Sequence, residues 1–231
     1  MAVLECRQLT KKYGNVTALD RIDLALEPGR IVGLVGPNGS GKTTLIKLAQ
    51  HLLTPTEGKI LVGGMEPGAE TKGIVSYLPD RDFLPAWMNV ESLLFFYQDF
   101  FADFDMERAV QMLQALGIDE KRTFKKLSKG TREKVQLIMT MSRKASVYLL
   151  DEPIAGVDPA ARDYILRTII GNYSENSLVL ISTHLIADVE PVLDEVVFLK
   201  QGRIELHENA DALRERTGMS VDGYFREVYR C

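Results

Sequence analysis

Residues 36–44 read Gly36-Pro37-Asn38-Gly39-Ser40-Gly41-Lys42-Thr43-Thr44 and fit the pattern G-x-x-x-x-G-K-[ST] at every constrained position. An apolar run of buried-strand type, residues 31–35, precedes this stretch, and a helix-forming segment, residues 44–49, follows it. In such an arrangement the glycines let backbone N–H groups turn toward a polyphosphate, and the helix N-terminus attracts anions. Lys42 is expected to reach the β- and γ-phosphates, and Thr43 to ligate Mg²⁺. The stretch therefore predicts a site for a nucleoside triphosphate.

The composition is that of a soluble globular protein with one sizeable core. The chain has 231 residues, of which 45% are hydrophobic and 26% charged, and its net charge of −4 argues against a nucleic-acid partner. No apolar run approaches the ~20 residues that a membrane span needs, and the first residues lack the layout of a secretory signal, so we expect a cytosolic chain. Cys6 and Cys231 are too few and too separated to predict a disulfide framework or a metal site.

The order of hydrophobic patterns predicts an α/β core that is interrupted by helices. Residues 3–79 are rich in strand patterns, and residues 90–144 show apolar positions at helical spacing. Three continuous apolar runs then alternate with helical segments, as buried parallel strands do. We expect a single domain with an α/β core at about 1–79 and 146–208, a helical subdomain at about 80–145 and a short helical tail at about 209–231.

Two carboxylates follow the apolar run of residues 147–150 directly. Asp151 and Glu152 are thereby placed at the C-terminal edge of a buried strand, where open α/β sheets hold ligands. Asp151 can hold the Mg²⁺ shell through water, and Glu152 is suited to polarise a water for attack on the γ-phosphate. The alternative, a strand that simply ends in a solvated Asp-Glu pair, is the lesser one because a phosphate loop precedes the pair.

A second anion site is indicated at Leu127-Ser128-Lys129-Gly130-Thr131, because Ser128 lies at the N-terminal edge of a predicted helix. Taken alone, the segment fits an ordinary N-cap serine with a turn glycine equally well. The order of motifs is more specific. A phosphate loop, a helical insert, Leu-Ser-x-Gly, an apolar strand with Asp-Glu, and then Ser182-Thr183-His184 resemble the ATP-binding cassette (ABC) proteins over nearly the whole chain.

The resemblance implies that two cassettes pair head to tail, with each ATP held between one phosphate loop and the other chain's signature segment. Ser128 and Gly130 then contact the γ-phosphate bound to the partner. His184 resembles the switch histidine of the family, so that Lys42, Glu152 and His184 are the expected catalytic residues. Tyr13 resembles the aromatic residue on which adenine stacks, its alternative being an edge-strand core aromatic. In the loop at 155–159, Asp158 is expected to touch the partner cassette.

Two departures from the family pattern are visible. Asp80 stands where members usually carry the Gln that contacts Mg²⁺ and the attacking water; it can still bind the metal, but it adds negative charge near the γ-phosphate. In the signature segment, Lys129 replaces the first Gly and Thr131 the Gln. Leu-Ser-Lys-Gly and the terminal residues 221–227 are similar to cassettes of bacterial antibiotic exporters, notably the bacitracin-resistance branch.

Eight of the 18 aromatic residues lie between residues 83 and 104. For most of them the core of the helical subdomain is the expected place. The resemblance adds that this region receives a coupling helix from a transmembrane permease subunit, for which Phe83 and Trp87 are the candidate contacts. Seven basic residues around the signature segment are expected to form a solvated face, with attraction to ATP or anionic lipid as the alternative: Lys121, Arg122, Lys125, Lys126, Lys129, Arg132 and Lys134.

The leading hypothesis is an ATP-hydrolysing subunit that powers a bacterial exporter from the cytoplasmic face of the cell membrane, where its partner holds it. It uses ATP and Mg²⁺, and the working pair is either a homodimer or a heterodimer with a related cassette. Two alternatives stay open at this point. One is a soluble ABC protein that acts on ribosomes or DNA, and the other is a regulatory module with little turnover, suggested by Asp80 and Lys129.

Overall fold

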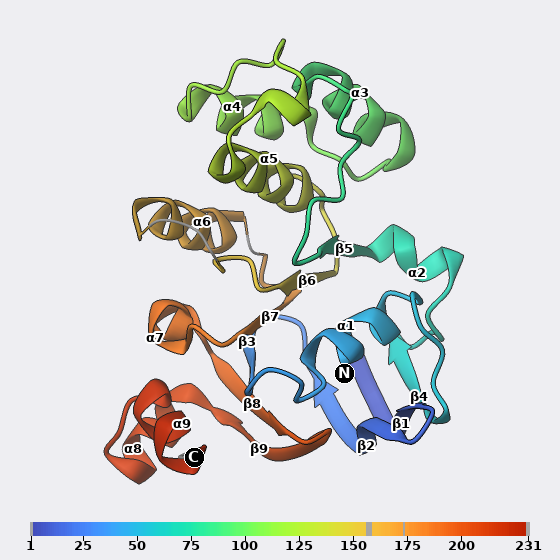
Figure 1. Cartoon of the computed structure of the whole chain (residues 1–231), viewed down its shortest axis with the longest axis vertical. Helices are drawn as coiled ribbons and strands as arrows, with labels where there is room; N and C mark the ends of the chain where they lie inside the picture. The colour runs from blue at the N-terminus through green and yellow to red at the C-terminus, as the bar shows by residue number, and fades with distance from the viewer. Residues whose placement is uncertain (1, 156–158, 173, 230–231) are drawn as a thin grey trace.

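The computed structural model describes residues 2–155, 159–172 and 174–229. A six-stranded sheet forms its centre (Figure 1). Its first five strands are parallel and its last is antiparallel to its neighbour. In spatial order these are β5 (Val75–Leu78), β6 (Val147–Asp151), β7 (Leu178–Thr183), β3 (Arg30–Val35), β8 (Glu195–Lys200) and β9 (Arg203–Asn209). The predicted fold class, an α/β core interrupted by helices, is confirmed.

Alternate residues of the central strands enter two different cores, as the two-residue period of a strand requires. Ile31 and Ile181 belong to the cluster on one face, which also receives side chains from α5 (Lys129–Met141) and α6 (Pro159–Asn172). Their neighbours Val32 and Leu180 belong to the cluster on the other face, together with α1 (Lys42–Ala49). Because both faces are covered, the strands read as continuous apolar runs.

A smaller antiparallel sheet closes the second core. It has the order β2-β1-β4, with β2 at Val16–Leu26, β1 at Leu4–Tyr13 and β4 at Glu57–Val62. The end of β2 alternates between exposed and buried side chains, since only one face of this sheet meets the core. A short helix that the strand-rich pattern did not predict, α2 (Ala69–Ile74), leads into β5.

The helical subdomain has a hydrophobic cluster of its own, at the end of the molecule opposite the C-terminus (Figure 1). It contains α3 (Val90–Phe100), α4 (Met106–Ala115), the 3₁₀ turn η1 (Phe124–Lys126) and α5. Asn89, Asp105 and Ser128 each accept a backbone hydrogen bond as N-caps of α3, α4 and α5. The division of the chain at about residues 79, 145 and 208 remains a prediction.

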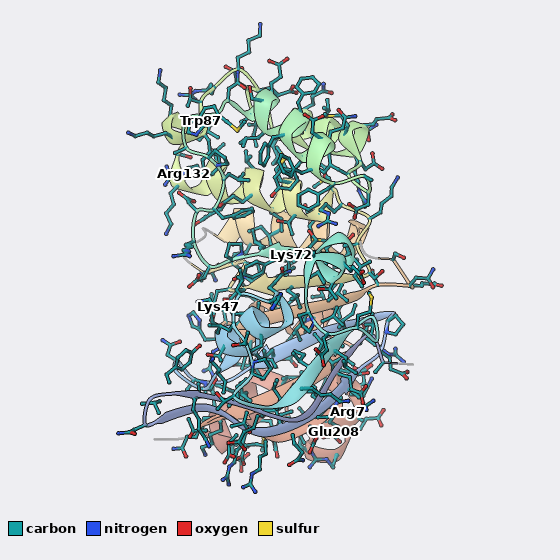
Figure 2. The ribbon with its side chains drawn as sticks, turned by 90° about the vertical axis from the view of Figure 1, so that its right-hand side faces the viewer. Arg7, Lys47, Lys72, Trp87, Arg132 and Glu208 are labelled. Atoms are coloured by element: carbon teal, nitrogen blue, oxygen red, sulfur yellow. The ribbon has the colours of Figure 1, made fainter. Side chains whose placement is uncertain are left out.

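The aromatic residues of this region divide as the helical stripe predicts. Five of the eight pack against a hydrophobic cluster: Phe83, Phe96, Tyr97, Phe101 and Phe104. Trp87, Phe95 and Phe100 are exposed, and Trp87 is the most exposed of them at 77%. Figure 2 places Trp87 on the helical subdomain, at the end of the molecule remote from Glu208.

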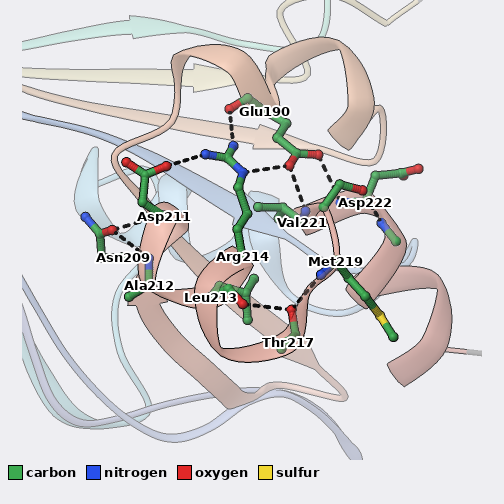
Figure 3. A network of polar contacts seen from close by, with 12 residues as sticks. Glu190, Asn209, Asp211, Ala212, Leu213, Arg214, Thr217, Met219, Val221 and Asp222 are labelled. Atoms are coloured by element: carbon green, nitrogen blue, oxygen red, sulfur yellow. Dashed lines mark hydrogen bonds and ion pairs between the residues drawn. The ribbon is translucent and has the colours of Figure 1, made fainter.

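Two helices near the C-terminus, α8 (Ala210–Thr217) and α9 (Val221–Val228), pack on the core and are also linked to it by one buried carboxylate (Figure 3). Glu190, 9% exposed, accepts from the Nε of Arg214 at 3.1 Å and from the backbone N–H of Val221 at 2.8 Å and of Asp222 at 3.2 Å. Glu190 therefore neutralises the half-buried Arg214 and also caps the start of α9. Glu190 lies in the 3₁₀ turn η2 (Glu190–Val192), directly after α7 (Ile186–Val189).

Within the described ranges, no helix is both long and apolar enough to span a bilayer.

Candidate active site

The loop between β3 and α1 is shaped by glycines that no other residue can replace without strain. Gly39 and Gly41 have φ angles of 79° and 112°, in the region that side chains disfavour. A Cβ on Gly36 would lie 2.2 Å from the carbonyl oxygen of Leu199, and one on Gly41 would lie 2.5 Å from that of Ala18. The loop can therefore fold inward and present backbone N–H groups at the start of α1.

Lys42 is the first residue of α1, and its ammonium group lies within the loop. Its Nζ donates to the carbonyl oxygens of Gly36 at 2.8 Å and of Pro37 at 3.2 Å. Burial lowers the pKa of Lys42, while the carboxylates of Glu152 and Asp151 oppose the shift. Lys42 is buried, with 6% of its surface exposed, and it brings positive charge into the loop. This charge suits an anionic ligand.

Asp151, at the end of β6, is buried and only half satisfied. Its Oδ1 accepts from the hydroxyl of Thr43 at 3.2 Å and from that of Ser182. Its Oδ2 is buried and has no hydrogen-bond partner among the described residues. Burial raises the pKa of Asp151, and the hydrogen bonds from Ser182 and Thr43 counter this. An unpartnered carboxylate oxygen beside a threonine hydroxyl fits the hard oxygen ligands that Mg²⁺ prefers, directly or through water.

Glu152 and His184 meet because β6 and β7 are neighbouring parallel strands. The ring Nδ1 of His184 lies 2.9 Å from Oε2 of Glu152. Glu152 has a φ of 52°, uncommon for a residue with a side chain, and its backbone N–H donates to the carbonyl of Ser182 at 3.0 Å. This backbone geometry, held by the next strand, aims the carboxylate toward the histidine.

A cavity of about 250 Å³ lies between the phosphate loop and Glu152. The predicted residues that line it are Asn38, Gly39, Ser40, Gly41, Lys42, Thr43, Thr44, Asp80 and Glu152. Asp80 is an exposed residue on the loop after β5, and it faces the phosphate loop across the cavity. A site with an ammonium group, N–H groups and two carboxylates can bind a metal-complexed polyphosphate and activate a water beside it.

Other predicted site residues lie away from this cavity. Ser128 is exposed at the start of α5, where its hydroxyl accepts from the backbone N–H of Thr131 at 3.2 Å and contacts the Thr131 hydroxyl at 2.7 Å. Gly130 follows in the first turn of the same helix. Tyr13, 46% exposed, ends β1 with the Lys11 ammonium 5.3 Å from its ring centre. Asp158 lies outside the described residues.

Sequence reasoning missed two contributors to the site. Ser182 was noted as part of a motif, yet its bond to Asp151 depends on the register of β6 and β7, in which the two residues are partners. Ala18 lines the cavity from β2, on the other sheet, and an alanine carries no chemical signal of such a role. The sequence offered one signal for Ser182: it lies near the end of an apolar strand, as Asp151 does.

A second hollow of about 280 Å³ lies between the helical subdomain and the edge of the core, beside β5. Its lining includes Phe83, Phe96, Tyr97 and Phe101, with the buried guanidinium of Arg143 among them. Trp87 is not in this lining. This aromatic groove is distinct from the phosphate-loop cavity but shares its neighbourhood, because Asp80 and Phe83 belong to one loop.

Comparison with known proteins gives a consistent result. The sequence pattern of the family described as ABC transporter matches residues 19–155. The ABC transporter ATP-binding protein YtrB of Bacillus subtilis (strain 168) is 28% identical over 216 residues, which cover 92% of this chain and 74% of YtrB. The SkfA peptide export ATP-binding protein SkfE of the same organism is 28% identical over 210 residues, or 88% of each chain.

Solved structures agree. An ATP-binding subunit of an ABC transporter superposes with a TM-score of 0.89 at 26% identity, covering 99% of this chain and 100% of that one. These similarities favour the transporter hypothesis over the soluble and regulatory alternatives. Together with the loop at residues 36–44 and the Asp151 and Glu152 pair beside it, they show that the chain belongs to the ABC transporter family, as an ATP-binding subunit that hydrolyses ATP.

Proposed function

We propose that this chain powers an exporter as one of a pair of cassettes that close on Mg²⁺-ATP while docked to a separate membrane subunit. The main observation in support of this proposal is that the chain has two separate groups of residues, each suited to one half of a nucleotide site. One half is the cavity with Lys42 and Glu152, and the other is the exposed Ser128 hydroxyl on α5. Two copies placed head to tail bring each half against its complement.

The chemistry of this proposal uses side chains whose positions the fold has fixed. Lys42 and the N–H groups of the loop bind the phosphates, and Glu152 takes the proton from the attacking water. His184, 2.9 Å from Glu152, orients that carboxylate. Thr43, Asp151 and Asp80 would hold Mg²⁺, which supplies neutralisation of the phosphate charge. Asp80 adds one negative charge to this group, so turnover depends strongly on the metal.

The partner half contributes contacts to the same nucleotide. Ser128 and Gly130, at the N-terminus of α5, suit the γ-phosphate bound by the second copy, since hydroxyl and helix terminus both favour an anion. The ring of Tyr13 is exposed and suits stacking by adenine. Asp158 is proposed to touch the second copy. A related cassette in place of an identical one serves equally, because the proposal needs only a complementary half.

The membrane subunit is proposed to insert a helix into the aromatic groove lined by Phe83. Aromatic anchors in a groove are typical of helix recognition. Such docking holds the chain at the cytoplasmic face of the membrane. We propose export as the direction of transport and an antibiotic or peptide as the cargo. The relative SkfE, whose name assigns it to export of the SkfA peptide, supports this proposal, and so does the Leu-Ser-Lys-Gly segment.

The test is Mg²⁺-dependent ATPase activity of the purified chain, compared between wild type and Glu152→Gln. The variant is expected to lose about 10²–10⁴-fold in kcat and to form a dimer in ATP on size exclusion, because nucleotide is bound but not cleaved. Glu175→Gln, the same change at an exposed loop residue, is the matched control and keeps full activity. A Glu152→Gln variant that hydrolyses like wild type, or a wild type that does not bind ATP, contradicts the proposal.

A further inference from the structure

The loop that carries Asp80 is tied to the helix that carries Ser128 by Gln136, a side chain that takes no part in the proposed chemistry. Gln136 is 4% exposed in the middle of α5. Its Oε1 accepts from the backbone N–H of Phe83 at 2.9 Å, and its Nε2 donates to Oδ1 of Asp82 at 3.1 Å. A buried amide is costly unless it is hydrogen-bonded, so these two contacts hold Gln136 and the loop together.

Arg132, one turn earlier on α5, continues the connection toward the signature segment. Its Nε lies 2.8 Å from Oδ2 of Asp82 as an ion pair. Its Nη1 donates to the carbonyl oxygen of Leu127 at 3.2 Å. Leu127 directly precedes Ser128, so a continuous series of polar contacts runs from the loop of Asp80 to the residue that caps α5.

The contacts lie where loop and helix are not closely packed. Asp82, Arg132 and Gln136 line a hollow of about 260 Å³, together with Asp80 and Glu152. Because this hollow separates the loop from part of α5, the polar contacts bridge loop and helix there, where apolar packing is missing. At its two ends the same loop reaches the phosphate-loop cavity through Asp80 and the aromatic groove through Phe83.

We propose that Gln136, with Asp82 and Arg132, is a positioning residue that makes the placement of Ser128 depend on the nucleotide bound in the same chain. A displacement of the Asp80 loop on nucleotide binding is passed to α5 through Asp82 and the Phe83 backbone, and so reaches the half-site that the second copy uses. By linkage, engagement of Ser128 with the second copy strengthens nucleotide binding in the first by the same factor. This inference rests on the proposed function for the role of the second copy.

The first test measures two affinities in the Glu152→Gln background. Gln136→Leu keeps the size of the side chain and removes both contacts. It is expected to leave the Kd for ATP of the monomer within about twofold, and to weaken ATP-dependent dimerisation about tenfold by analytical ultracentrifugation. Thr140→Val is the matched control: Thr140 is also buried, one turn later on α5, and among the described residues its hydroxyl bonds to its own helix, at the carbonyl of Gln136, 2.9 Å away. This control is expected to match the parent.

A second variant tests the same contacts without changing a buried residue, so that misfolding of Gln136→Leu cannot explain the result. Asp82→Ala changes an exposed side chain and removes the partner of both Gln136 and Arg132. It is expected to weaken dimerisation in the same direction as Gln136→Leu. Dimerisation at the parental level in either variant overturns the inference.

Hydrogen exchange on the monomer separates this inference from the proposed function. In wild type, Mg²⁺-ADP is expected to change exchange of the backbone N–H groups of residues 128–132, and this response is lost in Gln136→Leu but kept in Thr140→Val. An equal response in wild type and Gln136→Leu overturns the inference. A parent that never dimerises in ATP overturns the paired-cassette function, while the exchange result still decides whether Gln136 couples loop and helix.

Discussion

The two halves of the nucleotide site differ in how many of their contacts the chain itself supplies. In the phosphate-loop half, Asp151 is bound by Thr43 and Ser182, and Glu152 by His184, each from a different element. In the signature half, the Ser128 hydroxyl contacts only its own helix turn at Thr131, as far as the described residues extend. On the proposed function, we therefore expect the phosphate-loop half, called the prebuilt half below, to bind nucleotide in the single chain, and the signature half to act only on the nucleotide of a second copy.

We expect the largest effect on nucleotide binding from a substitution in the prebuilt half. Lys42→Ala removes the ammonium group from the loop, and nucleotide binding by the isolated chain should fall about 10³-fold, since a buried charge on phosphate is lost. Isothermal titration with ATP measures this. Lys47→Ala, on the same helix α1, is the control and should bind like wild type. Retained affinity in Lys42→Ala would show that the loop backbone alone suffices.

A smaller effect, confined to the pair, is expected from the signature half. Ser128→Ala should lower kcat about 10–100-fold while the ATP affinity of the monomer stays unchanged, because the hydroxyl serves the nucleotide of the second copy. Ser220→Ala is the matched control: Ser220 caps α9 in the same manner, accepting from Gly223 N–H at 3.0 Å. Both variants lose an N-cap worth about 1 kcal/mol, so only Ser128→Ala should lose activity. An equal loss of activity in Ser128→Ala and Ser220→Ala would show that Ser128 acts only as a helix cap.

The third effect is on the stability of the folded chain, which the buried Asp151 of the prebuilt half is expected to lower. Since burial raises the pKa of Asp151, its ionised form destabilises the folded state at neutral pH. Asp151→Asn, measured without nucleotide, should raise Tm by about 2–4 °C at pH 7, corresponding to about 1 kcal/mol.

The sign of the pH dependence follows from that pKa. As pH falls through the raised pKa toward the ordinary Asp range near about 4, the folded wild type takes up the proton first and the Tm difference should close. Asp163→Asn, at an exposed position of α6, should show no such difference. A constant difference across pH would assign the gain to packing instead of charge.

The smallest effect on the isolated chain is expected from Trp87. The side chain is 77% exposed, so Trp87→Ala should change the free energy of unfolding by less than about 0.5 kcal/mol and leave ATPase activity intact. The fraction of chain recovered with membranes should nevertheless fall if Trp87 contacts the membrane subunit. Phe95→Ala, another exposed aromatic, is the comparison. Equal membrane recovery for Trp87→Ala and wild type removes Trp87 from the docking surface and leaves the groove at Phe83.

Positions that depend on neighbouring residues were predictable from the sequence, while the roles of those residues remain predictions. The glycine spacing of residues 36–44 fixes a phosphate loop wherever it follows a strand, and the apolar run before Asp151 fixes the edge at which that carboxylate lies. Each of Glu152 and His184 was expected after an apolar strand, but their contact was not predicted and follows from the pairing of β6 with β7. The helix cap at Ser128 follows from residue type and the apolar spacing after it.

Roles that depend on register between distant segments were not predictable. Gln136 bonds to residues 53 and 54 positions earlier, and within its helix it reads as an isolated polar residue in an apolar stretch. The helix α2 is six residues long and has little periodicity to reveal it. Ala18 enters the nucleotide cavity only because the small sheet packs beside the loop.

The carboxylate of Glu190 has a consequence for the synthesis of the chain. Glu190 is translated 24 residues before Arg214 and 31 residues before Val221, the groups that neutralise and receive its charge. Until those residues exist, the segment after His184 cannot bury Glu190 without an uncompensated charge. We therefore expect the segment around Glu190 to reach its final packing only after α8 and α9 have been made. A chain truncated near residue 208 lacks only about a tenth of the residues, yet it leaves Glu190 without these contacts, so we expect it to be less stable and more exposed to proteases.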